Sequence, residues 1–356
     1  MSSKILKRAV PVLLLLVLIL PIPASAGLPA YLEITFLSTN DLHAHDVPIT
    51  IAGDPARNIA PIPDVGGMAR IATVIKRIRA ETGDPVVLLD SGDTTHGYTA
   101  LPKAFHGAST IAIMNALGYD AMVPGNHDFQ WHSVDTVRNH DQSQFPWISA
   151  NVVDAKTGKQ WLLPFIIREI GGVRVAFFGL MNDLPKTQAN VYVAAPELGL
   201  TVLPAKEVAA KLVPELRTKA DIVVLLSHLG ATADTQLAQA VPGIDAIFGG
   251  HTHTRLSTPR MAKVGERTAF SLGAVPIVQA AYYGQYVGKT RLVFRRDEVT
   301  GRYSLMRCKG ELIAINNTIP DDPEIAGIIA AFKARIPPPP PPAPPAQPAL
   351  AAPAAK

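Results

Sequence analysis

The feature that most constrains the fold is a placement that recurs five times along the chain. Five short apolar runs each end in a polar cluster, and the clusters read STNDLHAHD, DSGDTTHG, GNHDFQWH, SHLG and GGHTHT. Apolar runs of this length, bounded by turn residues, predict buried strands. In α/β sheets the loops beyond the carboxyl ends of strands gather at one edge, where ligands bind. Five polar loops from distant parts of the chain are therefore expected to meet at one site.

Between the predicted strands lie segments with apolar residues at helical spacing. The clearest predicted helices cover residues 67–81, 109–118, 205–219 and 322–335, and Pro214 is expected to kink or interrupt the third. This alternation predicts an α/β layered fold, and the strand-rich later part favours mixed rather than purely parallel sheets. Predicted strands cover residues 31–38, 85–90, 120–124, 145–152, 165–170, 173–180, 221–227, 244–250, 267–272, 275–281 and 286–294.

Both ends of the chain differ in composition from the part between them. Three basic residues among the first eight precede a short apolar run and the small residues 24–26. This order is typical of a secretory signal peptide, here residues 1–26. An uncleaved membrane anchor is the alternative, but the run is shorter than the roughly 20 residues of a spanning helix. Residues 337–356 are rich in Pro and Ala and predict a disordered spacer whose partner is unknown.

Composition limits the classes of partner. The chain has 33 Lys and Arg against 29 Asp and Glu, and three of the basic residues lie in the signal peptide, so the exported chain is nearly neutral. No basic run indicates nucleic-acid binding, and no later segment is apolar for long enough to span a membrane. Cys308 is the single cysteine, which excludes an internal disulfide and a cysteine metal cluster. Residues 27–336 are thus predicted to form one domain with a large core, periplasmic or secreted.

The residues in the five loops are of the types that bind metals. Imidazoles, carboxylates and an amide without thiolates suit Zn, Mn or Fe(II). Taken singly, several clusters also fit simpler roles, such as a turn at Asp41 or Asp93 and a core histidine at His228. The joint pattern, with metal-capable residues after each of five strands, favours a metal site. The residues concerned are Asp41, His43, Asp93, Asn126, His127, His228, His251 and His253.

The ordered motifs Asp-x-His, Gly-Asp, Gly-Asn-His-Asp, His and Gly-His-x-His resemble those of the calcineurin-like metallophosphoesterases. The longer strings STNDLHAH, GGMAR, DSGDTTHG, PGNHDF and GGHTH are similar to the exported bacterial 5'-nucleotidase and 2',3'-cyclic phosphodiesterase branch. The resemblance covers about residues 31–335. It implies a four-layer α/β/β/α sandwich with mixed sheets and a two-metal centre at one sheet edge.

The resemblance also implies a role for each residue. The implied ligands are Asp41, His43 and His253 for the first metal, Asn126, His228 and His251 for the second, and Asp93 as a bridge between them. His127 would contact the phosphate, together with Asn126, and assist the leaving group. In such a centre two divalent metals bridge and activate a water that attacks the phosphoryl group in line.

Three departures from the nucleotidase pattern bear on function. Gln130 stands where an Asp usually orients the catalytic histidine, and an amide cannot stabilise an imidazolium by charge, so Asp128 is expected to take part with His127. His253 stands where nucleotidases often have another polar residue, and Gly249 and Gly250 are expected to let the backbone turn sharply before it. The family's second, base-binding domain is also expected to be missing, because polyproline follows the last helix.

The leading hypothesis is an exported dinuclear phosphoesterase that hydrolyses nucleotide-type phosphomonoesters. The amide at Gln130 and the expected lack of a base clamp keep a 2',3'-cyclic nucleotide phosphodiesterase or a broad organic phosphoesterase open, and a thiosulfohydrolase relative is a more distant interpretation. A non-catalytic metal- or partner-binding module is the alternative of another class. His45, His96 and His132 lie beside the motifs and are interpreted as loop histidines that could line the substrate edge.

Overall fold

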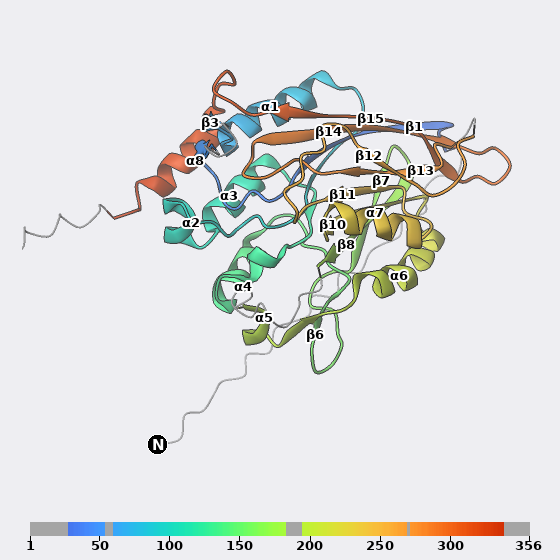
Figure 1. Cartoon of the computed structure of the whole chain (residues 1–356), viewed down its shortest axis with the longest axis horizontal. Helices are drawn as coiled ribbons and strands as arrows, with labels where there is room; N and C mark the ends of the chain where they lie inside the picture. The colour runs from blue at the N-terminus through green and yellow to red at the C-terminus, as the bar shows by residue number, and fades with distance from the viewer. Residues whose placement is uncertain (1–27, 54–59, 183–193, 269–270, 338–356) are drawn as a thin grey trace, which may run out of the picture.

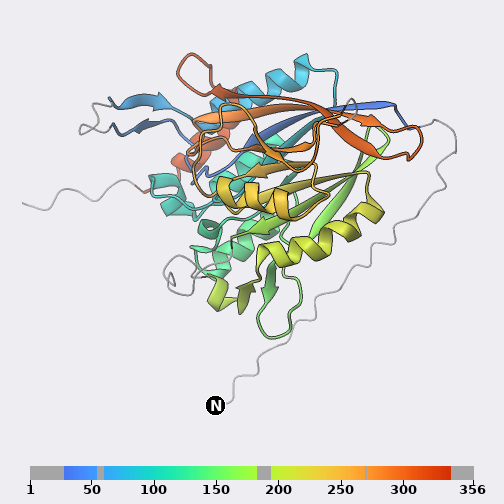
Figure 2. The same ribbon diagram turned by 45° about the vertical axis from the view of Figure 1, so that its right-hand side comes forward.

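The computed structural model describes residues 28–53, 60–182, 194–268 and 271–337, which form two packed β-sheets flanked by helices (Figures 1 and 2). The signal peptide predicted over residues 1–26 and nearly all of the Pro/Ala-rich tail lie outside these ranges. Within them, the helices are too short or too polar to cross a bilayer.

The first sheet has the strand order β15-β14-β1-β4-β5. Strand β1 pairs in parallel with β4, which pairs in parallel with β5, while β14 and β15 add an antiparallel half. The strands are β1 (Tyr31–Thr39), β4 (Val86–Asp90), β5 (Ala121–Met122), β14 (Tyr286–Arg296) and β15 (Tyr303–Ala314).

The second sheet has the order β12-β13-β11-β10-β8-β7. Its four central strands are parallel, and an antiparallel strand closes each edge. Both sheets are therefore mixed, as predicted. The strands are β7 (Phe165–Ile170), β8 (Val173–Met181), β10 (Ile222–His228), β11 (Ala246–Gly249), β12 (Arg260–Lys263) and β13 (Ala274–Val278).

Helices cover the outer faces of both sheets, which gives the four layers (Figure 1). Side chains of β10 alternate: Ile222, Val224 and Leu226 pack between the sheets, while Val223 and Leu225 pack toward the helices. This confirms the mixed α/β fold and its layer order. The covering helices are α1 (Met68–Glu81), α3 (Ala108–Leu117) and α8 (Pro323–Lys333) on the first sheet, and α6 (Ala205–Lys219) and α7 (Ala231–Ala240) on the second.

Two local predictions were wrong, a helix boundary at Pro214 and a strand over residues 145–152. Helix α6 continues through Pro214, because both Pro214 and Ala210, whose carbonyl loses its partner, are exposed and water can satisfy that oxygen. Residues 145–152 make only isolated bridges at Trp147 and Ile148 before a short strand begins at Val152. Strands β12 and β15 were not predicted, and part of the strand predicted over 267–272 lies outside the described residues.

Smaller elements complete the fold. A hairpin of β2 (Ile49–Ile51) and β3 (Ile62–Val65) projects from the molecule (Figure 2), and β6 (Val152–Asp154) pairs with β9 (Leu200–Val202). The remaining helices described are α2 (Ala100–Phe105), the 3₁₀ turn η2 (Asn126–Phe129), α4 (Ser133–Gln142) and α5 (Ala194–Glu197).

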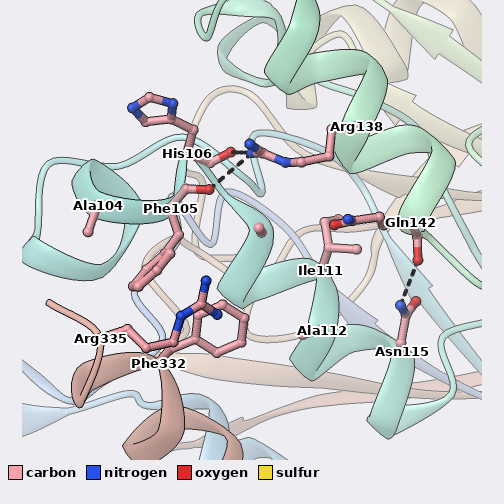
Figure 3. A pocket seen from close by; sticks show the side chains of 11 residues that line it. Ala104, Phe105, His106, Ile111, Ala112, Asn115, Arg138, Gln142, Phe332 and Arg335 are labelled. Atoms are coloured by element: carbon pink, nitrogen blue, oxygen red, sulfur yellow. Dashed lines mark hydrogen bonds between the residues drawn. The ribbon is translucent and has the colours of Figure 1, made fainter.

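A hollow of about 460 Å³ lies among α2, α3, α4 and α8 (Figure 3). The Arg335 guanidinium lies 4.9 Å from the ring centroid of Phe105 and 5.3 Å from that of Phe332. None of the ligands predicted from the sequence lines this hollow, so it is separate from the strand ends that carry them.

Candidate metal centre

The strand ends that carry the predicted ligands meet at one edge of the sandwich. In the first sheet Thr39 of β1 pairs with Asp90 of β4, and in the second Ser227 of β10 pairs with Gly249 of β11. Parallel strands in register end together, so the loops that follow them lie side by side. The structure thereby brings together residues that are more than 200 positions apart in the sequence, such as Asp41 and His253.

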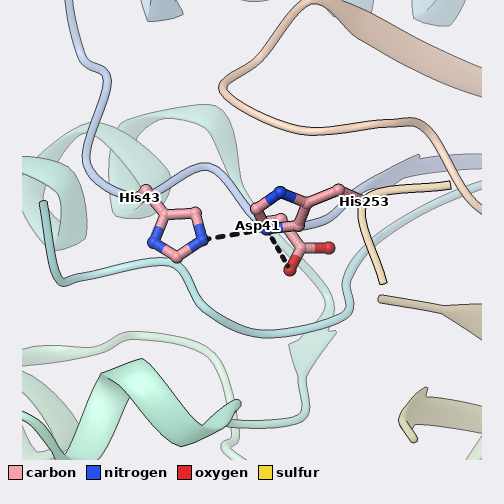
Figure 4. Close-up of side chains that lie close together, drawn as sticks. All are labelled: Asp41, His43 and His253. Atoms are coloured by element: carbon pink, nitrogen blue, oxygen red, sulfur yellow. Dashed lines mark hydrogen bonds and ion pairs between the residues drawn. The ribbon is translucent and has the colours of Figure 1, made fainter. Parts of the chain in front are cut away.

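The first ligand group consists of Asp41, His43 and His253, whose ligand atoms all lie within 4.8 Å of one another (Figure 4). The Nε2 atoms of His43 and His253 are 3.2 Å apart, and His253 Nε2 is 3.3 Å from Asp41 Oδ1. Three side chains from two loops therefore aim their ligand atoms at one point.

The second group consists of Asp93, His228 and His251, again within 4.8 Å. His228 Nε2 lies 3.2 Å from Asp93 Oδ2, and the Asn126 amide oxygen lies 3.1 Å from His251 Nδ1. The same Oδ2 of Asp93 is 3.8 Å from His43 Nε2 in the first group. Asp93 thus stands between the two groups, where a bridging ligand would stand.

The donor set fits two divalent cations. Asp41 and Asp93 are buried carboxylates, and His228 Nε2 is a buried nitrogen without a well-aligned hydrogen bond in the described part of the chain. Burial opposes protonation of His228, but the charges of Asp93 and Asp41 outweigh it and raise its pKa to about 10. The buried negative charge thus requires a positive charge at this nitrogen, and a bound cation would take the place of the proton.

One hydrogen bond and burial prepare two of the imidazoles as ligands. His228 Nδ1 donates to the backbone oxygen of Ser91 at 2.6 Å, which leaves Nε2 pointing at Asp93. Burial lowers the pKa of His43 to about 4, so this ring is neutral at physiological pH, as a metal ligand must be.

Five of the predicted ligands have left-handed backbone conformations, which non-glycine residues seldom adopt. The φ angles are 50° for Asp41, 46° for His43, 55° for Asp93, 76° for His251 and 52° for His253. Such residues cost of order 1–3 kcal/mol each and persist where surrounding structure enforces them, commonly at functional sites. Strain concentrated on the ligand set supports a functional role for these loops.

The expectation that Gly249 and Gly250 provide the sharp turn was wrong. Neither has a positive φ, and the left-handed residues are His251 and His253 themselves. A Cβ on Gly250 would lie 2.5 Å from the Ser91 oxygen, and one on Gly249 would collide with the Asp234 carboxylate. These glycines are required because the loop after β4 packs directly against Gly250 and the Asp234 side chain of α7 packs against Gly249.

His127 lies half-buried on η2, with its ring centroid 5.0 Å from that of His43. Its Nδ1 donates to Oε1 of Gln130, so the amide holds the imidazole where relatives were expected to use a carboxylate. The backbone N–H of His127 donates to Asp93 Oδ1 at 2.7 Å. One short turn therefore positions both the ring and the central carboxylate.

Asp128 does not occupy the catalytic position expected for it. It is completely buried, and its two oxygens accept backbone N–H groups of Asp93, Thr94, Thr95 and Gly125 at 2.8–3.0 Å. Gln130, not Asp128, contacts the ring of His127. Asp128 instead fastens the loop that carries Asp93 to the loop that carries Asn126 and His127.

We expect Gly125→Ala to disrupt the centre. A Cβ there would overlap Asp93 Oδ1 and lie 2.6 Å from His228 Cε1. Such overpacking destabilises a core by about 1–3 kcal/mol. Metal content and melting temperature should both fall. Gly83→Ala is the matched control, since a Cβ there meets no atom within 4 Å and both measurements should stay unchanged. Full metal content in Gly125→Ala would contradict the observed packing.

Several residues at the site had not been predicted. Asn40 donates to Asp41 Oδ2 at 2.6 Å and to the Ala281 backbone oxygen at 2.7 Å. It therefore connects the predicted ligand Asp41 to the distant loop that contains Ala281. Tyr282 and Tyr283 follow in that loop, and Trp131 lies 4.4 Å from the ring of His96. Asn40 and Trp131 lie within the clusters STNDLHAHD and GNHDFQWH, but no role was assigned to them, and the two tyrosines lie outside the five clusters. The roles of all four depend on long-range packing.

The three histidines beside the motifs have different positions. The ring of His45 stacks on Tyr283 at 4.0 Å and that of His96 on His127 at 5.7 Å, so both border the site. The His132 side chain is 71% exposed and pairs with Glu197 outside it.

The sequence profile described as calcineurin-like phosphoesterase matches residues 34–255, which contain every predicted ligand. The chain belongs to the calcineurin-like phosphoesterase family. This confirms the family predicted from the motifs, a family of metal-dependent phosphoester hydrolases, and it agrees with the two ligand groups in the structure.

Relatives of this calcineurin-like phosphoesterase include nucleotide-hydrolysing proteins. The snake venom 5'-nucleotidase of Gloydius brevicauda is 29% identical over 320 residues, which cover 85% of this chain and 52% of that protein. The trifunctional nucleotide phosphoesterase protein YfkN of Bacillus subtilis is 28% identical over 297 residues, covering 74% of this chain and 18% of YfkN. The phosphoesterase thus spans about half the length of the first relative and a smaller share of the second.

A solved structure agrees with this relationship. The 5'-nucleotidase precursor of Thermus thermophilus superposes with a TM-score of 0.70 at 27% identity, covering 85% of this chain and 58% of that one. The fold of the phosphoesterase is thereby shared with a 5'-nucleotidase structure.

Proposed function

We propose that this phosphoesterase hydrolyses nucleotide-type phosphate monoesters at a two-metal centre. The observation that carries the proposal is the position of Asp93 Oδ2, 3.2 Å from a nitrogen of one ligand group and 3.8 Å from a nitrogen of the other. Two cations held by these residues would supply an activated water and would neutralise charge on the phosphoryl oxygens.

The ligand assignment follows the two groups. Because Asp93 lies between them, we assign it to both metals. Its buried carboxylate is held by the N–H of His127 through one oxygen, which leaves the other oxygen for the metals. We assign Asp41, His43 and His253 to the first metal, and Asn126, His228 and His251 to the second. The identity of the metals, Zn, Mn or Fe, is left to measurement.

His127 is the residue we assign to the leaving group. Its Nδ1 is engaged by Gln130, so Nε2 is the nitrogen available to the substrate. When protonated, Nε2 can donate to the ester oxygen as the bond to phosphorus breaks. Asn126 precedes it in the same turn, and we assign its amide N–H₂ to a phosphoryl oxygen. Asp128 acts as a positioning residue beneath both.

The substrate class rests on the relatives. The snake venom and Thermus thermophilus proteins are named 5'-nucleotidases, which favours a nucleotide monoester. A broader phosphoesterase, including one acting on 2',3'-cyclic nucleotides, is the second candidate. It is favoured by the contact between His127 and the neutral amide of Gln130, and by the trifunctional relative YfkN.

We also propose that the protein is exported and that residues 27–336 form the catalytic domain. The order of basic, apolar and small residues over positions 1–26 supports export. A relative found in snake venom is consistent with it. The Pro/Ala-rich segment that follows is proposed to be a spacer.

A substrate panel tests the function. The purified full chain, reconstituted with Mn or Zn, should bind close to two ions and release phosphate from AMP, and a chelator should abolish the activity. Faster hydrolysis of 2',3'-cyclic AMP or bis-p-nitrophenyl phosphate than of AMP would favour the second candidate. Two bound ions without hydrolysis of these esters or of a UDP-sugar would overturn the enzymatic proposal in favour of a binding module.

A further inference from the structure

A strained loop places two tyrosines beside the first ligand group. Ala281 and Tyr283 have left-handed φ angles of 59° and 56° on either side of Tyr282. The loop is tied to the predicted ligands, since the N–H of Tyr283 donates to the Asp41 backbone oxygen at 2.7 Å. The N–H of Ala281 donates at 3.3 Å to the backbone oxygen of Thr254, the residue after His253. Strain of this kind persists where the surroundings enforce it and commonly marks a functional position.

The rings of this loop contact the predicted ligands directly. Tyr282 stacks on His253 with centroids 4.8 Å apart and an interplanar angle of 19°. Tyr283 meets the ring of His43 edge-on at 5.4 Å and stacks on His45 at 4.0 Å. Both tyrosines therefore contact a predicted ligand, and Tyr283 also extends the aromatic surface from His43 outward to His45.

A second aromatic surface begins at His127. The ring of His96 stacks on His127 at 5.7 Å, and Tyr98 meets His96 edge-on at 5.1 Å. Tyr98 is 65% exposed. The ring of His127 in turn lies 5.0 Å from that of His43, which Tyr283 contacts, so a continuous series of ring contacts joins Tyr98 to Tyr283 around the centre.

The position of Tyr98 is not explained by a role in packing against the predicted ligands. Its ring contacts none of the predicted metal ligands among the described residues, and about two thirds of its surface faces water. Exposed aromatic rings near a polar site provide flat surfaces on which planar groups stack, and such stacking contributes about 1–3 kcal/mol per base. The ring of Tyr98 contacts that of His96, and the ring of Tyr283 contacts that of His43, so each tyrosine lies next to a histidine at or beside the centre.

We propose that Tyr98 and Tyr283 form a binding site for a planar ring in the alcohol part of the substrate, such as a nucleobase. This inference rests on the proposed function, in which the phosphate lies at the metals and His127. A sugar placed between phosphate and base would then carry the base outward to the two tyrosines. The site would select esters with a flat aromatic group over ring-less sugar or glycerol phosphates.

The test compares kcat/KM for AMP with that for ribose 5-phosphate. In Tyr98→Leu and Tyr283→Leu this ratio should fall by roughly tenfold each, the loss expected from one stacking contact. Tyr98→Phe should retain the ratio, because the ring is kept. Tyr31→Leu is the matched control, since Tyr31 is 54% exposed at the start of β1, away from the strand ends that carry the ligands. Metal content is measured in every variant.

Calorimetric measurement of adenosine binding to the metal-loaded protein separates this inference from the proposed function. Adenosine has no phosphate to hydrolyse, so binding that weakens about tenfold in both leucine variants supports the site even without turnover of AMP. An unchanged AMP to ribose 5-phosphate ratio, or adenosine binding that is undetectable or insensitive to both substitutions, would overturn the inference. If Tyr283→Leu lost metal, its effect on the ratio and on adenosine binding could come from the damaged centre. The Tyr98→Leu variant would then decide whether the inference holds, because the Tyr98 ring contacts no predicted ligand among the described residues.

Discussion

Asp93→Ala should abolish turnover and metal binding together. Asp93 is the one residue whose carboxylate oxygen lies within 4 Å of imidazole nitrogens from both ligand groups in the described structure. Metal ions supply several kcal/mol of transition-state stabilisation, and each 1.36 kcal/mol or so is a factor of ten, so the rate should fall by roughly 10³-fold or more. Phosphate release from AMP and metal content by elemental analysis are the two measurements.

Asp141→Ala is the matched control for this substitution. The Asp141 side chain on α4 is 66% exposed and contacts only His140 among the ion pairs described, so neither rate nor metal content should change. If Asp93→Ala kept two ions per chain, the bridging assignment would be wrong, even if activity were lost.

His127→Ala should lower the rate while sparing the metals. Its ring is held by Gln130 and is not a member of either ligand group, so its removal takes away proton transfer and not a ligand. General acid catalysis contributes roughly 10²–10⁴-fold, and kcat for AMP should fall by that factor. Gln130→Ala should give a smaller loss, because the ring stays but its orientation is less restricted.

His132→Ala provides the comparison for a histidine near the motif but outside the site. Its side chain is 71% exposed and pairs with Glu197, so kcat should be unaffected. A loss of metal from His127→Ala equal to that from Asp93→Ala would show that the roles of these two residues are misassigned.

The fold class and the meeting of five loops could be predicted because they depend on local patterns. Buried strands such as β4 and β10 are continuous apolar runs, and parallel pairing brings their polar ends to one edge. The sequence also indicated which residue types could bind metal. The pairing of His253 with Asp41 and His43 followed from the family resemblance, and the structure now provides the geometry.

What could not be predicted depends on contacts between distant segments. Asp128 looked like a catalytic neighbour of His127, but four backbone N–H groups surround its carboxylate. Pro214 looked like a helix boundary, but exposure of the freed carbonyl lets α6 continue. The positions of Asn40 and Tyr283 depend on pairing across roughly 240 residues, which no local pattern encodes.

Each ligand group draws residues from loops of both sheets. Asp41 and His43 follow β1 and Asp93 follows β4 in the first sheet, whereas His228 ends β10 and His253 follows β11 in the second. An ion held by Asp41 and His253 would act as a cross-link that closes a loop of about 200 residues, a span over which closure removes much of the entropy of the unfolded chain. Because Cys308 is the single cysteine, no disulfide within the chain can do this. Loading the metals would thus fasten the two halves of the sandwich to each other.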